Sequence, residues 1–119
     1  MFPRLTLKMR SVLFNQTGPS SVLTLQDTPI PKLNSPSSIL IRNHAVGVNF
    51  IDTYHRSGLY KVDLPCIPGR EAAGIVEEVG SQISQFKKGD RVAYLGMGCY
   101  AEYTLQENGA LFFLKKLKG

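Results

Sequence analysis

The sequence predicts a mainly β domain, either a barrel or a sandwich, with few helices. Six or seven short runs of apolar and β-branched residues recur at regular spacing between turn residues, which is typical of such folds. The length of 119 residues suits one domain with a real core and is too short for a substrate domain plus a full nucleotide-binding domain. The composition, 43% hydrophobic and 19% charged, is ordinary for a soluble globular protein, and no apolar run approaches the roughly 20 residues that span a bilayer.

The first half of the chain is expected to hold three strands. Apolar and β-branched residues indicate strands at 10–14, 22–25 and 39–48, of which the last is the longest. Turn residues at 17–21 separate the first two strands, and the segment 27–38 is predicted to be a loop because it holds three prolines.

The second half is expected to open with a short helix. The segment 49–58 predicts one or two helical turns, because its residues are mixed and it ends at Gly58. Further strands are expected at 71–80, 91–95 and 99–105. The basic residues from Lys115 onward are expected to fray.

The net charge of +5 does not predict a nucleic-acid partner, because the positive charge sits at the two ends of the chain. The body from 11 to 114 holds eight of the 14 basic residues and all nine acidic ones, which gives it a net charge of −1. The basic start lacks acidic residues before Asp27, so a mitochondrial targeting segment at 1–8 is an alternative to a cytoplasmic location.

The cysteines and histidines do not predict a metal site, because none of them lies at a ligand spacing. Cys66 and Cys99 are expected to be reduced thiols in a reducing compartment, and the sequence leaves a disulfide open. His44 is expected to be a partly buried strand residue and His55 to lie on a polar helix face.

Residues 96–101 match the G-x-G-x-x-A pattern of dinucleotide-binding turns. That pattern needs a helix after it to receive the pyrophosphate, whereas the residues after Ala101 predict a strand. We therefore expect a hairpin turn here.

Polar and aromatic side chains gather next to a proline-rich loop at the predicted strand-to-helix junction. They are Asn49, Asp52, Tyr54, His55, Arg56 and Tyr60. Such groups often line a cleft, although an ordinary solvated loop has a similar composition.

At these residues the chain resembles a known family. The run GVNFIDTYHRSGLY at 47–60, PGREAAGIV at 68–76, KGDRV at 88–92 and YAEY at 100–103 resemble, in order and spacing, the signatures of zeta-crystallin-like quinone oxidoreductases. These belong to the zinc-free medium-chain dehydrogenase/reductase superfamily, and the resemblance covers about 9–105.

The resemblance implies a GroES-like, partly open β-barrel with one or two short helices at 9–106. It implies an N-terminal extension at 1–8 and a divergent basic tail at 107–119, with the Rossmann domain absent, and therefore a truncated form of the enzyme. The implied activity is hydride transfer from NADPH to a quinone. The alternative is a non-enzymatic GroES-like interaction module, and either form could be a homo-oligomer or pair with a full-length relative.

The resemblance also implies roles for residues of the 49–60 segment. Asn49 and Tyr54 are expected to be catalytic, and Arg56 and Tyr60 to border the substrate entrance. The nicotinamide side of the cleft would be lined by Phe50, Ile51, Asp52, Thr53 and Tyr54.

Neither a catalytic nor a structural zinc is expected. Asn49 and Arg70 stand where zinc alcohol dehydrogenases of the superfamily have a cysteine and a histidine, and the four-cysteine structural lobe is absent from the sequence.

Structural roles remain alternatives for several of these side chains. Tyr54 would then only pack, Asp52 would cap the helix, and Arg56 would pair with Asp63. Glu71 is expected to be a structural charge partner of the preceding arginine.

Overall fold

Seven strands and one α-helix make up the secondary structure of residues 7–107 and 113–118, the part of the chain that this computed structural model describes. In chain order the elements are β1 (Lys8–Leu13), the 3-10 turn η1 (Ser20–Val22), β2 (Thr24–Pro29), β3 (Ser38–Val46), α1 (Phe50–Ser57), β4 (Glu71–Val79), β5 (Arg91–Leu95), β6 (Tyr103–Glu107) and β7 (Phe113–Lys116). No helix in this part of the chain is long and apolar enough to cross a bilayer.

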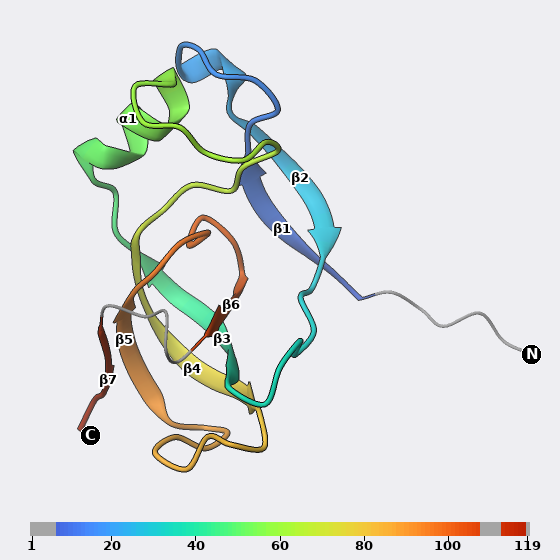
Figure 1. Cartoon of the computed structure of the whole chain (residues 1–119), viewed down its shortest axis with the longest axis vertical. Coiled ribbons are helices and arrows are strands. Elements are labelled where there is room, and N and C mark those ends of the chain that lie inside the picture. The colour runs from blue at the N-terminus through green and yellow to red at the C-terminus, as the bar shows by residue number, and fades with distance from the viewer. Residues whose placement is uncertain (1–6, 108–112, 119) are drawn as a thin grey trace, which may run out of the picture.

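The strands form two antiparallel sheets (Figure 1). β1 and β2 make a two-stranded ribbon, and the larger sheet has the order β6-β3-β4-β5-β7. The described sheets do not close into a barrel, so the prediction of a mainly β, partly open GroES-like domain is confirmed. α1 lies at one end of the molecule, beyond the sheet and beside the 3-10 turn.

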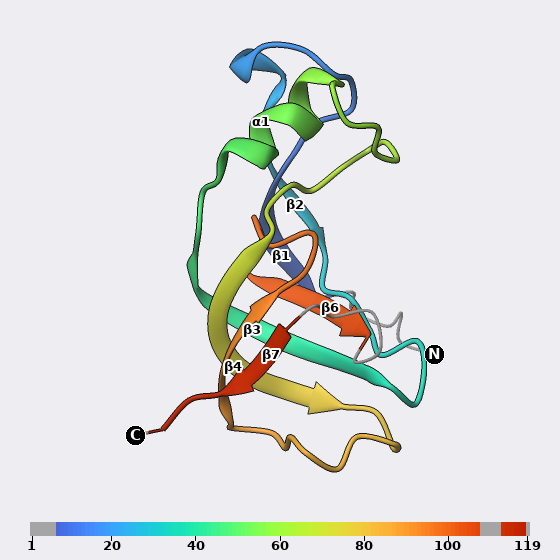
Figure 2. The same cartoon turned by 60° about the vertical axis from the view of Figure 1, so that its left-hand side comes forward.

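β4 is strongly bent, and Figure 2 shows it curling along its length beside β3. Two irregularities in the β3–β4 register, at Leu40/Ile41 and at Asn43/Ala45, account for the bend, because bulges increase local twist. At the second one, Gly74 lies against the Arg42 carbonyl, and any Cβ at that position would overlap the carbonyl oxygen.

The core lies on the inner face of the bent sheet. The fully buried Ile39 and Ile41 of β3 meet Val76 of β4 and Val92 of β5. Burying one such side chain contributes about 1.5–3 kcal/mol.

The strand predicted at 91–95 is confirmed, and so is the prediction that the helix ends at Gly58. β2 runs to Pro29, where a loop was predicted, because an edge strand tolerates a residue without an N–H. β6 starts only at Tyr103, because the preceding residues contact β1 instead: Ala101 bridges Ser11, and the Val12 N–H donates to the Tyr100 carbonyl at 2.8 Å.

The domain boundary at Gln106 stays a prediction, and strand structure is present beyond it. Glu107 ends β6, and β7 pairs antiparallel with β5 through Val92↔Lys116 to Leu95↔Phe113. At the other end β1 begins at Lys8, within the predicted extension, and residues 1–6 of the proposed targeting segment lie outside the described residues.

Candidate functional site

The predicted site residues lie at and just after the junction between β3 and α1. Asn49 is the N-cap residue, with extended φ −130° and ψ 156°, and it turns the chain into the helix. Gly58 ends the helix with φ +90°, a left-handed conformation that favours glycine.

Three aromatic rings of this segment are open to solvent. Phe50 is 83% exposed, Tyr60 51% and Tyr54 38%. The rings of Tyr54 and Tyr60 meet edge to face with centroids 5.5 Å apart, and the Tyr60 N–H donates to the Tyr54 carbonyl at 3.2 Å. The structure thus brings Tyr54 and Tyr60 together into one exposed aromatic surface.

Asp52 faces the protein interior, although it was predicted to bind cofactor. It is 5% exposed, and its Oδ2 accepts the Asn49 N–H at 2.9 Å. The Tyr100 hydroxyl donates to the same oxygen at 2.6 Å. These bonds give Asp52 the alternative role of a helix cap.

The two other predicted nicotinamide-side residues are half-buried. Ile51 and Thr53 flank the buried Asp52 along the helix. The Thr53 hydroxyl donates to the Phe50 carbonyl at 2.6 Å, so this side chain is bonded to its own helix.

Arg56 is turned toward the segment before the 3-10 turn. Its Nε donates to the Gly18 carbonyl at 3.2 Å, and the Gly18 N–H donates to the Arg56 carbonyl at 2.9 Å. The ion pairs found within residues 7–107 and 113–118 do not include the alternative pair of Arg56 with Asp63. The hydrogen bond of the Arg56 guanidinium is therefore made to the Gly18 carbonyl and not to Tyr54 or Tyr60.

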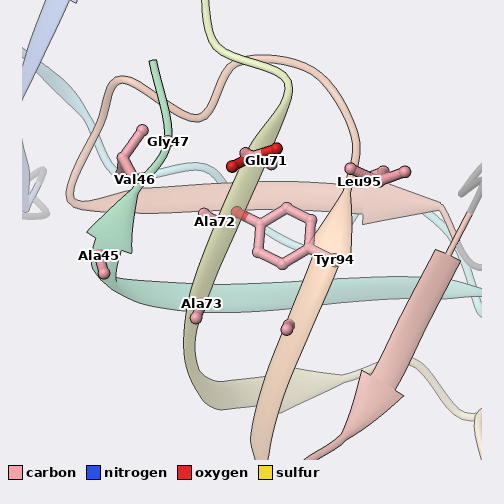
Figure 3. A pocket seen from close by; sticks show the side chains of 9 residues that line it. Ala45, Val46, Gly47, Glu71, Ala72, Ala73, Tyr94 and Leu95 are labelled. Atoms are coloured by element: carbon pink, nitrogen blue, oxygen red, sulfur yellow. The ribbon is translucent and has the colours of Figure 1, made fainter. Parts of the chain in front are cut away.

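A hollow of about 460 Å³ opens where β3, β4 and β5 end nearest α1. Its lining residues are Ala45, Val46, Gly47, Glu71, Ala72, Ala73, Ala93, Tyr94 and Leu95. Figure 3 shows the Tyr94 ring pointing from β5 toward β4, with Glu71 and Leu95 at the adjoining ends of the two strands. Because most of the lining side chains are as small as alanine, the backbone itself forms much of the surface.

Sequence reasoning missed this hollow, although the small residues of the EAAG segment were a signal of close approach. Its wall comes from three strand ends that are distant in the chain. Gly47 joins the hollow to the predicted site, because Asn49 follows two residues later and lies within about 7 Å along the chain. The Glu71 side chain covers Gly47, where a Cβ would overlap its carboxylate.

A buried polar network holds Tyr94, one of the residues that line the hollow. The Tyr94 hydroxyl donates to Asn43 Oδ1 at 2.6 Å, and Asn43 Nδ2 donates to Thr104 Oγ1 at 2.7 Å and to the Ala101 carbonyl at 2.9 Å. Burial raises the pKa of the Tyr94 phenol well above its usual range, so it stays a hydrogen-bond donor at neutral pH.

The histidines are placed opposite to expectation. His44 is exposed on β3, whereas His55 is 6% exposed on α1. The Nδ1 atom of His55 and the Oδ1 atom of Asp52 are buried without a hydrogen-bond partner among the described residues. Within residues 7–107 and 113–118, His, Cys, Asp and Glu form no group of three that could hold a metal ion.

Both cysteines are buried free thiols. Burial raises the pKa of Cys99 to about 11, and burial and then the Asp63 carboxylate raise the pKa of Cys66. Cys66 lies in the wall of a second, open hollow of about 670 Å³ between the loop 61–67 and the Met97–Gly98 turn. Both thiols are therefore protonated and weakly nucleophilic at neutral pH.

The prediction of a hairpin turn at the G-x-G-x-x-A segment is wrong, because β5 and β6, which it connects, are not neighbours in the sheet. Gly98 takes φ +75°, and the chain continues into strand β6, so no helix N-terminus follows.

Comparison with known proteins decides the family. A sequence profile of the alcohol dehydrogenase GroES-like domain matches residues 35–116, which is more than half of the chain. The chain belongs to this family. The GroES-like domain match extends past Gln106 and includes β7.

The relatives of this GroES-like domain include quinone oxidoreductases. It is 52% identical over 95 residues to a probable quinone oxidoreductase of Schizosaccharomyces pombe, a match covering 78% of this chain and 29% of that protein. The quinone oxidoreductase of Pseudomonas syringae superposes with a TM-score of 0.85 at 41% identity, over 92% of this chain and 34% of that one. The Escherichia coli quinone oxidoreductase complexed with NADPH gives a TM-score of 0.80 at 38% identity, over 86% and 32%.

The chain thus spans about a third of the length of these relatives, and it corresponds to their N-terminal portion.

Proposed function

We propose that this GroES-like domain supplies the quinone-facing half of an NADPH-dependent quinone oxidoreductase. The observation that carries the proposal is the exposed pair Tyr54 and Tyr60, which lies on the segment that leads away from the alanine-lined hollow at Gly47. The similarity to quinone oxidoreductases, one of them complexed with NADPH, supports it.

The described residues fit the nicotinamide end of NADPH. A planar ring can approach the backbone of β4 and β5 closely, because Ala72, Ala73 and Ala93 leave room over it. Residues 96–101 do not form a phosphate-binding site of the dinucleotide type, because that site needs a helix N-terminus after the glycines and a strand follows here. We therefore assign only nicotinamide contacts to this domain.

The residues around the hollow would bind and orient the reactants. When bound, NADPH supplies a hydride to the quinone, and a proton from solvent completes the hydroquinone. Phe50 and Tyr54 would cover the flat faces of the rings and exclude water, and the Asn49 amide would hydrogen-bond a ribose or quinone oxygen. Tyr60 would form the rim through its contact with Tyr54. An electron-poor quinone accepts hydride without a Lewis acid. The main role of these side chains would therefore be to position the nicotinamide and the quinone.

The test is reduction of a simple para-quinone by the purified chain with NADPH. Tyr54→Ala is expected to lower turnover by about tenfold or more, because it removes the ring that orders the reactants. Leu25→Ala is the matched control, since Leu25 is 67% exposed on the separate β1–β2 ribbon.

Binding can be read independently of turnover. Reduced nicotinamide mononucleotide, added to labelled protein, is expected to shift NMR signals of Asn49, Tyr54 and the hollow. A folded chain that neither turns over quinone nor shows these shifts contradicts the proposal and favours an interaction module.

A further inference from the structure

Tyr100 links the body of the domain to the start of α1. Its hydroxyl donates at 2.6 Å to the same Asp52 oxygen that accepts the Asn49 N–H at 2.9 Å. Asp52 is 5% exposed, so its carboxyl group and the hydrogen bonds to the two donors are shielded from water. One oxygen atom therefore joins the turn before β6 to the residue that caps the helix.

Tyr100 is itself held at several points. Its N–H donates to the Pro68 carbonyl at 2.9 Å, and its carbonyl accepts the Val12 N–H at 2.8 Å. Its ring passes over Gly69, where a Cβ would stand 2.5 Å from the ring Cδ1 and 2.9 Å from the Tyr100 nitrogen. Gly69 also has φ +107°, so the position favours glycine twice over. The phenol is thus aimed at Asp52 from a rigid base.

The other end of α1 is tied to a different part of the chain. The two hydrogen bonds between Arg56 and Gly18 hold its last turn to the segment before the 3-10 turn. A helix of eight residues has little stability of its own, so its direction depends on such anchors. Tyr54 lies between the anchors, two residues after Asp52.

We propose that Tyr100 is a positioning residue for Asn49 and Tyr54. It acts through Asp52, by fixing the angle at which α1 leaves β3, and it needs no contact with cofactor or quinone. The consequence for turnover rests on the function proposed above, whereas the anchoring does not.

The decisive substitution is Tyr100→Phe, which keeps the ring over Gly69 and removes only the hydroxyl. We expect amide hydrogen exchange at Asn49 to rise about tenfold or more, because its acceptor is no longer fixed, while exchange in β3 and β4 stays unchanged. The nuclear Overhauser contact between the rings of Tyr54 and Tyr60 is expected to weaken. Asp52→Asn retains an oxygen acceptor and should preserve both readouts, whereas Asp52→Ala should lose both.

Tyr103→Phe is the matched control, because it removes a phenol from the neighbouring strand β6. If Tyr100→Phe leaves Asn49 exchange and the ring contact as in the control, the proposal is overturned. If they change and the wild-type chain turns over quinone, kcat should fall about tenfold with little change in KM; an unchanged kcat would also overturn it. If the wild-type chain shows no turnover, the proposed function fails, and exchange and the ring contact alone decide the positioning role.

Discussion

Tyr94→Phe separates the two roles of a side chain that both lines the hollow and holds its wall. The substitution keeps the ring and removes the hydroxyl that donates to Asn43 Oδ1 at 2.6 Å. Tyr94 is 2% exposed, so water cannot easily replace the lost donor. Leaving a buried acceptor without its partner costs about 1–3 kcal/mol of the free energy of unfolding.

For a domain of this length, about 1 kcal/mol corresponds to roughly 4 °C in Tm, so we expect Tm to fall by roughly 4–12 °C. Thermal and urea unfolding, followed by circular dichroism, give the two measurements. Tyr103→Phe on β6 is the control, because its side chain is half-buried; it should change the free energy of unfolding by no more than about 0.5 kcal/mol.

Binding of reduced nicotinamide mononucleotide to Tyr94→Phe should remain within about twofold of wild type, because the ring that faces the hollow is unchanged. Equal Tm values for Tyr94→Phe and Tyr103→Phe would refute the idea that this hydroxyl secures the wall.

Further predictions concern buried groups and pH. His55→Leu should leave Tm unchanged or raise it, because the substitution removes a buried ring nitrogen that lacks a partner; a loss above about 1 kcal/mol would show that the imidazole is bonded. Gly74→Ala should destabilise by about 1–3 kcal/mol in urea unfolding, because the new methyl overlaps a backbone carbonyl oxygen; wild-type stability would contradict the close approach. Cys99 has its pKa raised from 9.0 to about 11, so the unfolded chain loses its proton first and stability should fall as the pH rises through this interval, an effect that Cys99→Ala should reduce. Glu107 has its pKa lowered by three serine hydroxyls, so its stabilising effect is present above pH 4.5 and lost on further acidification, and Glu107→Gln should flatten the acid limb of a pH series of Tm values.

Local signals in the sequence were sufficient for part of the fold. The strand at 91–95 and the helix end at Gly58 follow from short-range pattern and turn chemistry, and both are confirmed. The segment 99–102 has strand-like composition but pairs irregularly with β1, which is about 90 residues away in the chain. β7 was missed for a similar reason, since only the free edge of β5 gives its four residues a partner.

The roles of the site residues stay predictions, but the exposure of their side chains can be compared with the sequence motif. The motif contains the exposed Phe50, Tyr54 and Tyr60, and it also contains Asp52, whose side chain is buried. Asp52 is buried against Tyr100, which lies 48 positions later in the chain. The pattern of residues within the eight-residue helix cannot indicate such a distant partner. The hollow was missed because residues from three strands meet only after the sheet has formed.

The way the ribbon β1–β2 attaches to the larger sheet has a consequence for synthesis. The ribbon lies within residues 8–29, and its contacts with the body include Cys66, through Phe14, and Ala101, through Ser11. A chain growing from its N-terminus therefore carries this ribbon without its contact to Ala101 until about 70 residues after the ribbon itself is complete. The exposed strand β2 and its Leu25 side chain would be open to other chains throughout that interval. Chaperone contact early in translation should accordingly concentrate on the first 30 residues.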